Sequence, residues 1–164
     1  MKDLLQSIPH TGKIEWIGLR PQKRGALASV QNARLTPEEG LTGDHYSGRS
    51  GKRQVTLVQA EHLPVVAAIL RKDKTDPALT RRNIVVSGIN LLALKGQQFR
   101  MGEALLEYTG ACHPCSRMEE NFGPGGYNAM RGHGGITAKV IEGGTIAVGD
   151  VVSLIVSSNE PDHE

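Results

Sequence analysis

Short segments in which apolar and polar residues alternate recur along the whole chain, at roughly ten-residue spacing and with glycines between them. Alternation of this kind is typical of β-strands that bury one face. The apolar run Ile84-Val85-Val86, which ends at a serine and a glycine, also predicts a strand. We therefore expect strands at residues 13–19, around 30, and at 54–58, 84–86, 97–101, 104–109, 136–141, 146–148 and 151–156.

Helical spacing is found in two places. Apolar residues in 61–71 recur at the period of an amphipathic helix, and a second helix is expected at 116–122 behind Pro114, a residue suited to the first helical position. Many short strands with only one or two helices favour an antiparallel barrel or sandwich over a parallel βαβ sheet. The predicted fold class is therefore mainly β, an antiparallel β-barrel with a few short helices.

Two glycine-rich segments, 40–51 and 123–135, separate the expected strands. The first contains Asp44 and His45, and long loops with specific polar residues are commonly functional. We expect the loop 40–51, the turn at Arg82-Asn83 and the segment 112–133 to converge on one cleft, because rigid barrels present binding residues at the ends of their strands.

Composition limits the possible functions. The chain has 164 residues and a net charge of +2, with acids and bases interspersed, so we expect one domain that binds neither nucleic acid nor a membrane surface. The first twelve residues hold no apolar run of the kind found in signal peptides. A cytoplasmic location is expected, and there two cysteines at C-x-x-C spacing favour catalytic, redox or metal chemistry over a structural disulfide.

Both cysteines, Cys112 and Cys115, lie in one stretch with Pro114 and Arg117. A helix that starts at Pro114 would place Cys115 in the first turn, where unpaired amides and Arg117 favour the thiolate, which is the nucleophilic and metal-binding form. The alternative is that each cysteine is a small buried apolar residue, which is common for free cysteines.

Three chemistries fit this stretch to different degrees. A dithiol oxidoreductase is disfavoured, because its C-x-x-C follows the first strand of a βαβ unit, whereas this one lies two-thirds along a β-rich chain. A structural zinc site lacks a second ligand pair. The third is a single thiolate that carries sulfur or binds a thiol-preferring metal, with glycine loops and arginines around an anionic cofactor.

The chain resembles the MOSC domain, the family named after the C-terminal part of molybdenum cofactor sulfurase, from Trp16 to Leu154. The residues that carry the resemblance occur in the family's order: Gly40-Leu41-Thr42-Gly43-Asp44-His45, Arg53-Gln54-Val55-Thr56-Leu57-Val58, Arg82-Asn83-Ile84, Gly88-Ile89-Asn90-Leu91, Pro114-Cys115 and Gly149-Asp150-Val151. The resemblance implies a barrel of the MOSC type at 13–156, between an N-terminal extension at 1–12 and a polar tail at 157–164.

The resemblance also implies a cofactor and a cysteine. A cysteine matching Cys115 carries sulfur or binds molybdenum in a molybdenum-pterin cofactor, some relatives reduce N-hydroxylated bases and amidoximes, and the family is associated with pyridoxal phosphate binding. Two residues depart from the family pattern. Cys112 has no counterpart there, which raises the possibility of a disulfide or of a step that resolves a persulfide. Arg82 stands where many relatives carry an acidic residue.

Candidate roles follow from side-chain chemistry. Cys115 is the expected metal ligand or sulfur carrier, and Arg53, Arg82, Arg117 and Arg131 are expected to receive anionic oxygens. Asp44 and His45 are candidates to orient substrate, cofactor or a proton, Asn83 to hydrogen-bond the cofactor, and His133 to donate a proton.

Two function classes stay open. One is a molybdenum-dependent reductase that acts on a small molecule with an electron-donor protein. The other is a sulfur-carrier or cofactor-binding module that serves a partner and receives sulfur from a donor protein.

Overall fold

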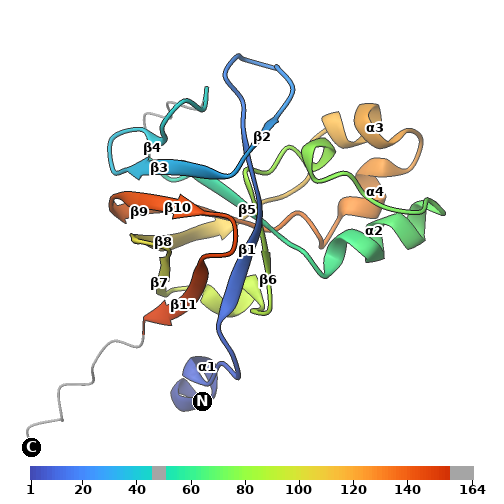
Figure 1. Cartoon of the computed structure of the whole chain (residues 1–164). Coiled ribbons are helices and arrows are strands. Elements are labelled where there is room, and N and C mark those ends of the chain that lie inside the picture. Colours follow the sequence, from blue (N-terminus) through green and yellow to red (C-terminus); the bar gives the residue numbers. More distant parts are fainter. Residues whose placement is uncertain (46–50, 156–164) are drawn as a thin grey trace, which may run out of the picture.

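Strands that are far apart in the sequence close into a barrel at the centre of the protein (Figure 1). A computed structural model describes residues 1–45 and 51–155, so residues 46–50 of the first glycine-rich loop and the tail at 157–164 lie outside the described residues. Within the described ranges, seven strands form the closed ring β11–β7–β8–β9–β5–β6–β1, in which β1 pairs again with β11. Their bounds are β1 (Gly12–Leu19), β5 (Val55–Gln59), β6 (Ile84–Ser87), β7 (Gln98–Met101), β8 (Ala104–Ala111), β9 (Ile136–Glu142) and β11 (Val151–Ile155).

The expectation of a β-rich barrel with a few short helices is therefore confirmed. The strand pairs are antiparallel except for β5 and β6, which run parallel with Leu57 opposite Ile84. A parallel pair needs a long crossover. Here the crossover contains α2 (His62–Leu70) and the 3₁₀ helix η1 (Pro77–Thr80).

Four short strands lie outside the seven-strand ring. β2 (Ala28–Val30) pairs with β1 beyond the ring, and β10 (Gly144–Ala147), β3 (Asn32–Thr36) and β4 (Gly40–Leu41) form a separate sheet in that order. β3 alternates buried and exposed residues, as a strand with one face on the core should. In β5 every residue is buried, which fits a strand covered on both faces.

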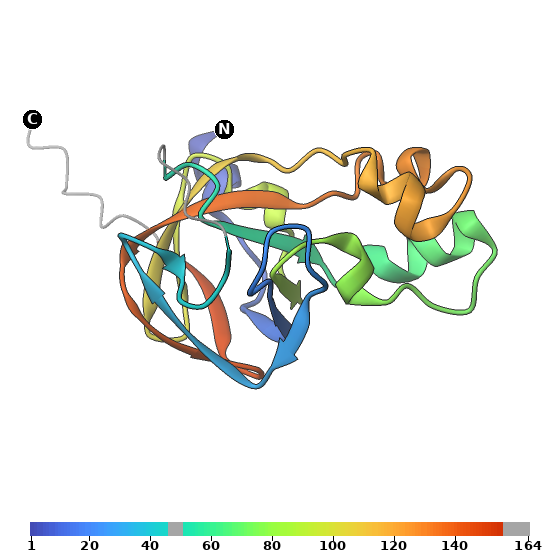
Figure 2. The same cartoon turned by 90° about the horizontal axis from the view of Figure 1, so that it is seen from above.

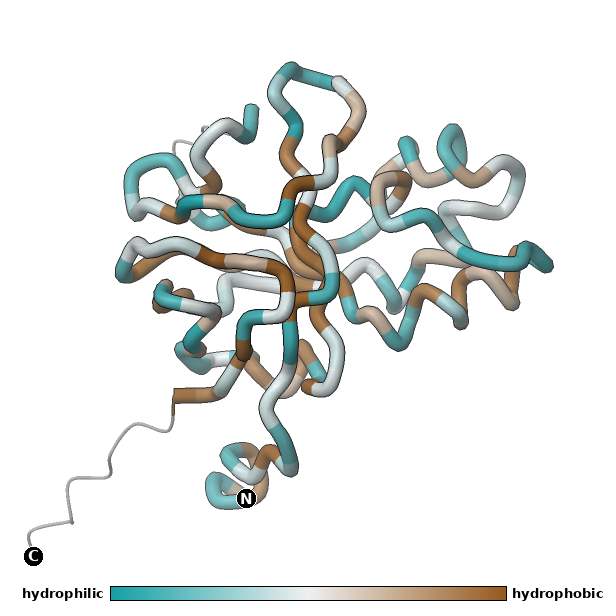
Figure 3. The backbone as a smooth tube through the Cα atoms, in the orientation of Figure 1, coloured by the Kyte–Doolittle hydropathy of each residue, from teal (hydrophilic) through white to brown (hydrophobic). Residues whose placement is uncertain are grey.

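Apolar side chains fill the inside of the barrel. Ile14, Leu57, Ile84, Phe99 and Leu106 belong to this core and are fully buried. Figure 3 shows the apolar segments gathered where the strands cross, with hydrophilic residues on the outer loops. The barrel therefore has its own packed core, and its strand ends are free to carry binding groups.

Three helices form a lobe on one side of the barrel, as Figures 1 and 2 show from two directions. α2, α3 (Arg117–Phe122) and α4 (Gly126–Met130) share a second apolar cluster that includes Val66, Met118 and Met130. Both methionines are fully buried packing residues. α4 was not predicted, because it begins inside the glycine-rich segment, where Gly126 lets the helix approach the carbonyl of Met118.

The remaining helices are short. α1 (Lys2–Gln6) is a single turn without buried residues, and the 3₁₀ helix η2 (Leu91–Leu94) follows β6. None of the helices in the described part of the chain is long and apolar enough to cross a bilayer.

The chain passes from the barrel into the lobe twice, and the second return passes through Gly134 and Gly135. Gly135 has φ +83°, and a Cβ there would overlap the carbonyl oxygen of Leu57. A Cβ at Gly134 would overlap the carbonyl oxygen of Cys112. These glycines let the start of β9 pack tightly between β5 and the segment that holds both cysteines.

Replacing Gly135 tests whether this close packing is needed. We expect Gly135→Ala to lower the free energy of unfolding by more than about 3 kcal/mol, since a left-handed backbone and an overlap with a buried carbonyl act together. Gly96→Ala is the matched control, because Gly96 has φ +73° but open space around the missing Cβ. It should cost only about 1–2 kcal/mol in urea unfolding. Equal losses in the two variants would show that the overlap does not matter.

Candidate functional site

The two cysteines lie between β8 and α3, where the barrel meets the helical lobe. The amide of Cys112 donates to the carbonyl of Gly135 at 2.8 Å, which extends the pairing of β8 with the chain before β9. After Cys112 the chain leaves the sheet, and α3 begins at Arg117 with Ser116 as its N-cap. The expected helix start at Pro114 is therefore wrong. Cys115 lies just before the N-cap rather than in the first turn.

The guanidinium of Arg82 holds this segment in place from inside the protein. Its Nε donates to the carbonyl of Gly134 at 2.7 Å, its Nη1 to that of Thr80 at 3.2 Å, and its Nη2 to those of His113 at 3.2 Å and Cys112 at 3.5 Å. Arg82 is only 4% exposed. Burial lowers the pKa of its guanidinium, whereas the sulfurs of Cys112 and Cys115 favour the charged form. Each nitrogen of Arg82 is thus engaged with the backbone, and its main role is to position the cysteine segment.

Beside this segment lies a cavity of about 420 Å³, which we call the Cys115 pocket. Its described lining contains Cys115, His45 and Thr56 but no carboxylate. Seven cationic side chains line it: Arg20, Lys23, Arg24, Arg53, Arg81, Arg82 and Arg117. The loop at 40–45, the turn at 81–82 and the cysteine segment therefore meet at one cavity.

The two thiols have different surroundings. Cys115 is exposed, whereas Cys112 is buried with 3% of its surface exposed, and neither forms a disulfide. Arg53 Nη2 approaches Cys112 Sγ at 3.7 Å, so this arginine points toward the sulfur that is not in the Cys115 pocket. Exposure, rather than a helical first turn, is what makes Cys115 the accessible thiol.

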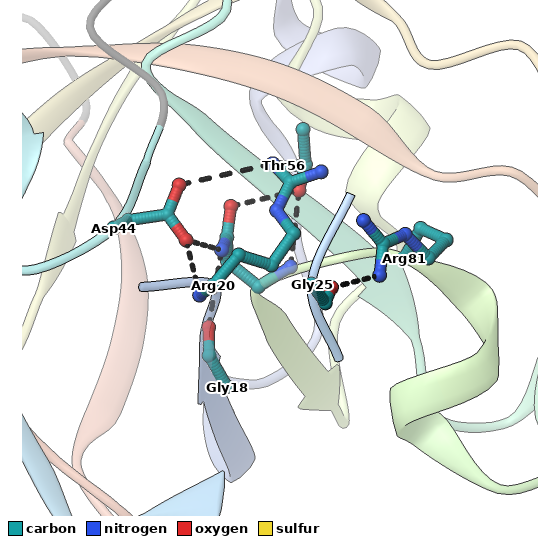
Figure 4. Close-up of polar contacts among 7 residues, drawn as sticks. Gly18, Arg20, Gly25, Asp44, Thr56 and Arg81 are labelled. Atoms are coloured by element: carbon teal, nitrogen blue, oxygen red, sulfur yellow. Dashed lines mark hydrogen bonds and ion pairs between the residues drawn. The ribbon is translucent and has the colours of Figure 1, made fainter. Parts of the chain in front are cut away.

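Asp44 and Asn83 form a buried hydrogen-bonded support for two pocket residues, Arg20 and Thr56. Figure 4 shows Asp44 beside Arg20. Asp44 Oδ1 accepts from the Arg20 amide at 2.7 Å and from Asn83 Nδ2 at 3.1 Å, and Asp44 Oδ2 lies 3.7 Å from Arg20 Nη2. Asn83 also donates to the carbonyl of Gly18 at 3.0 Å and accepts from the hydroxyl of Thr56 at 3.0 Å. Neither residue lines the pocket, and both fix the place of Arg20 and Thr56.

Three guanidinium groups share one side of the pocket. Burial lowers the pKa of Arg81, and the charges of Arg20 and Arg117 lower it further. The buried Nε atoms of Arg20 and Arg117 have no hydrogen-bond partner among the described residues, although Arg117 Nε lies 3.7 Å from Glu120 Oε2. Arg81 Nη1 donates to the carbonyl of Gly25 at 2.6 Å. Like charges this close, with free donors, form a site suited to a multiply charged anion.

Two of the predicted site residues lie elsewhere. The Nδ1 of His133 is 3.0 Å from the carbonyl oxygen of Ala129, and its ring contacts His62 with centroids 5.0 Å apart. Arg131 is exposed at the end of α4, where its side chain reaches Asn128 Oδ1 at 3.4 Å. Neither lines the Cys115 pocket. His62 is half-buried in this contact.

The sequence also missed residues that do line the pocket. Arg20, Lys23 and Arg24 belong to the loop between β1 and β2, and neither they nor Arg81, beside Arg82, were singled out. The signal that could have found them is the density of basic residues at 20–24 and 81–82, which is high for a chain of net charge +2.

Whether the Cys115 pocket can hold a metal ion depends on which groups besides Cys115 would coordinate the ion. The described residues contain no cluster of three or more His, Cys, Asp or Glu side chains that could hold an ion by themselves. A metal that arrives with its own organic ligand needs only one soft donor from the protein, and Cys115 is an accessible one. The surrounding cations fit an anionic organic ligand.

A model of the MOSC domain matches residues 28–153. This chain belongs to the MOSC domain family. The match covers β2 to β11 and thus includes the cysteine segment, Arg82 and most of the Cys115 pocket. No curated protein matches the chain.

Solved structures share the fold. The YUAD protein from Bacillus subtilis is 20% identical, with a TM-score of 0.77 over 88% of this chain and 96% of its own. YiiM from Escherichia coli is 22% identical, with a TM-score of 0.68 over 91% of this chain and 71% of its own. YiiM from Geobacillus stearothermophilus is 16% identical, with a TM-score of 0.69 over 88% of this chain and 75% of its own. At these identities the likeness concerns the fold.

Substitution of Arg82 tests its positioning role. Arg82→Lys keeps a positive charge but cannot reach four carbonyls from one planar group. We expect the free energy of unfolding to fall by about 2–4 kcal/mol, and the amide of Cys112 to lose protection from hydrogen exchange. Urea unfolding and residue-resolved hydrogen exchange measure the two effects.

Arg131→Lys is the matched control, because Arg131 is exposed and makes a single side-chain contact at 3.4 Å. It should change stability by less than about 0.5 kcal/mol. Unchanged exchange at Cys112 in Arg82→Lys would contradict the positioning role, even if the protein were less stable.

Proposed function

We propose that the Cys115 pocket binds an anionic cofactor of the molybdenum-pterin type, with the thiolate of Cys115 as the soft protein ligand. The observation that carries this proposal is the combination of one exposed thiol with seven cationic side chains around a cavity of about 420 Å³. Thiolates bind soft metals, and guanidinium groups bind phosphate oxygens in pairs. The cavity size is in the range of small-molecule and cofactor sites.

The residues in and around the Cys115 pocket have different roles in this proposal. Arg20, Arg81 and Arg117 would receive the phosphate of such a cofactor, because all three line the cavity and their positive charges act on one another. Asp44 holds the Arg20 side chain in position through an ion pair at 3.7 Å. Arg82 binds the backbone carbonyls of Gly134 and His113 and thereby fixes the place of the segment that holds Cys115.

His45 lines the pocket, and an imidazole can both donate and accept a proton. When bound, the cofactor would supply two-electron redox chemistry, and reduction of an N-hydroxylated compound requires protons as well as electrons. In this enzyme reading, His45 holds or moves a proton for a small-molecule substrate. Electrons come from a donor protein.

A second function is favoured by the exposure of Cys115. An accessible thiolate can attack the outer sulfur of a persulfide on a donor protein, which forms a persulfide on Cys115 and releases the donor's thiolate. The chain then carries sulfur for a partner without turnover of its own. Both proposed functions need a free thiol and therefore fit a reducing compartment such as the cytoplasm, where the two cysteines stay reduced.

Analysis of purified protein from a host that makes the cofactor tests the proposal. We expect the wild type to contain either molybdenum with pterin, or one extra sulfur atom on Cys115. Cys115→Ser should lose either one, since a hydroxyl is a hard and poorly ionised replacement for a thiolate. Cys112→Ser is the control and should retain it, because Cys112 is buried outside the Cys115 pocket.

The outcomes separate the two readings. Stoichiometric molybdenum and pterin support the enzyme, whereas metal-free protein with a persulfide on Cys115 supports the carrier. Pyridoxal phosphate, also associated with the family, is another anion, and mass analysis of the same sample detects it. Equal loss in both serine variants, or neither cofactor nor sulfur in the wild type, would overturn the proposal.

A further inference from the structure

A second cavity, of about 200 Å³, lies on the other side of the cysteine segment. We call it the His62 pocket, after the α2 residue in its lining. It shares no described lining residue with the Cys115 pocket: Cys112, His113 and Pro114 face this cavity, and Cys115 faces the other. The two cavities are therefore separate sites, and the segment 112–115 lies between them.

The lining of the His62 pocket is mostly apolar and uncharged, whereas that of the Cys115 pocket is strongly cationic. Leu91, Leu92, Ala111 and Pro114 supply apolar surface, and three glycines between 132 and 135 leave part of it as bare backbone. Among the described residues that line it, none is Lys, Arg, Asp or Glu. Such a lining favours an uncharged ligand, since it contains no charged side chain to compensate for the desolvation of a charged one.

Most of the polar lining groups are already used inside the protein. Gln59 donates to the carbonyl of Ile89 at 2.8 Å and accepts from the amide of Leu91 at 3.0 Å. Asn90 accepts from the amide of Leu92 at 3.2 Å. In contrast, no described residue hydrogen-bonds the imidazole of His62 or of His113. These two rings are therefore the groups available to a ligand.

The surroundings of His62 lower the pKa of its imidazole and so favour the uncharged form of the ring. Burial lowers the pKa of His62 and the neighbouring His133 lowers it further, while the carboxylate of Glu61 acts in the opposite direction. His133 also packs its ring edge-to-face against His62, at 71° between the planes. A neutral imidazole offers one donor and one acceptor.

We propose that the His62 pocket binds a small, flat, uncharged heteroaromatic molecule that hydrogen-bonds His62. The size supports one ring or a compact pair of rings, because an apolar cavity of about 150 Å³ accepts benzene. Leu92, which is 53% exposed, lies at the rim and can cover such a ring. This inference goes beyond the proposed function and is independent of it, since it involves neither Cys115 nor a cofactor.

The test is an NMR titration of the full chain with benzimidazole, at mildly alkaline pH. We expect saturable shifts of the amides of Ala111, Gly132, Gly134 and Gly135. Ala111→Phe fills the cavity from an exposed position at the end of β8 and should weaken binding by about tenfold or more. Ala28→Phe is the matched control, as an exposed strand alanine outside both pockets, and should bind like the wild type.

1-Methylbenzimidazole tests the hydrogen bond, because it keeps the ring and lacks the N–H. It should bind several-fold more weakly than benzimidazole. Shifts confined to residues of the Cys115 pocket, no saturable shift, or equal binding in Ala111→Phe and Ala28→Phe would overturn the inference. The spectra of the two variants show directly that each is folded.

Discussion

The arrangement of the site depends on one buried cation, the guanidinium of Arg82. It joins the turn before β6 to the carbonyls of Cys112, His113 and Gly134, which belong to the two chain segments that pass between barrel and lobe. A buried charge is tolerated only where hydrogen bonds replace its hydration. The backbone carbonyls around the cysteines accept those hydrogen bonds. The hydrogen bonds that replace the hydration of Arg82 therefore also fix the position of Cys115.

The second constraint is electrostatic. The structure gathers Arg20, Arg81 and Arg117 at one cavity, with the buried carboxylate of Asp44 beside Arg20 and the exposed carboxylate of Glu120 beside Arg117. Repulsion among these groups lowers the stability of the ligand-free protein, and an anion that binds there offsets it. The proposed anion would reduce this repulsion, whereas the lining of the neighbouring His62 pocket contains no charged side chain among the described residues.

The sequence predicted the fold better than the site. The alternation of apolar and polar residues in strands such as β7 is a local property of the sequence, and so it could be read from the chain. The site depends on contacts between distant segments: Arg82 looked like an anion-binding group, but backbone carbonyls from residues 112–134 occupy its donors. His133 resembled a proton donor among glycines, but α4, which begins in those glycines, turns it toward His62. Cys115 was singled out by its flanking residues, although its expected place in the first turn of a helix was wrong. His45, Arg53 and Arg117, which were also singled out, line the same pocket.

The most direct test of a strongly positive pocket around Cys115 is the ratio of its alkylation rates by iodoacetate, an anion, and by iodoacetamide, a neutral reagent of similar size. A cationic cleft concentrates anions by about tenfold or more at low salt, and added salt screens this effect. We expect the ratio to be about tenfold higher for Cys115 in the folded protein than in the urea-unfolded chain, and to fall with salt and in Arg81→Gln. A ratio that is the same in the folded and unfolded chain would contradict it.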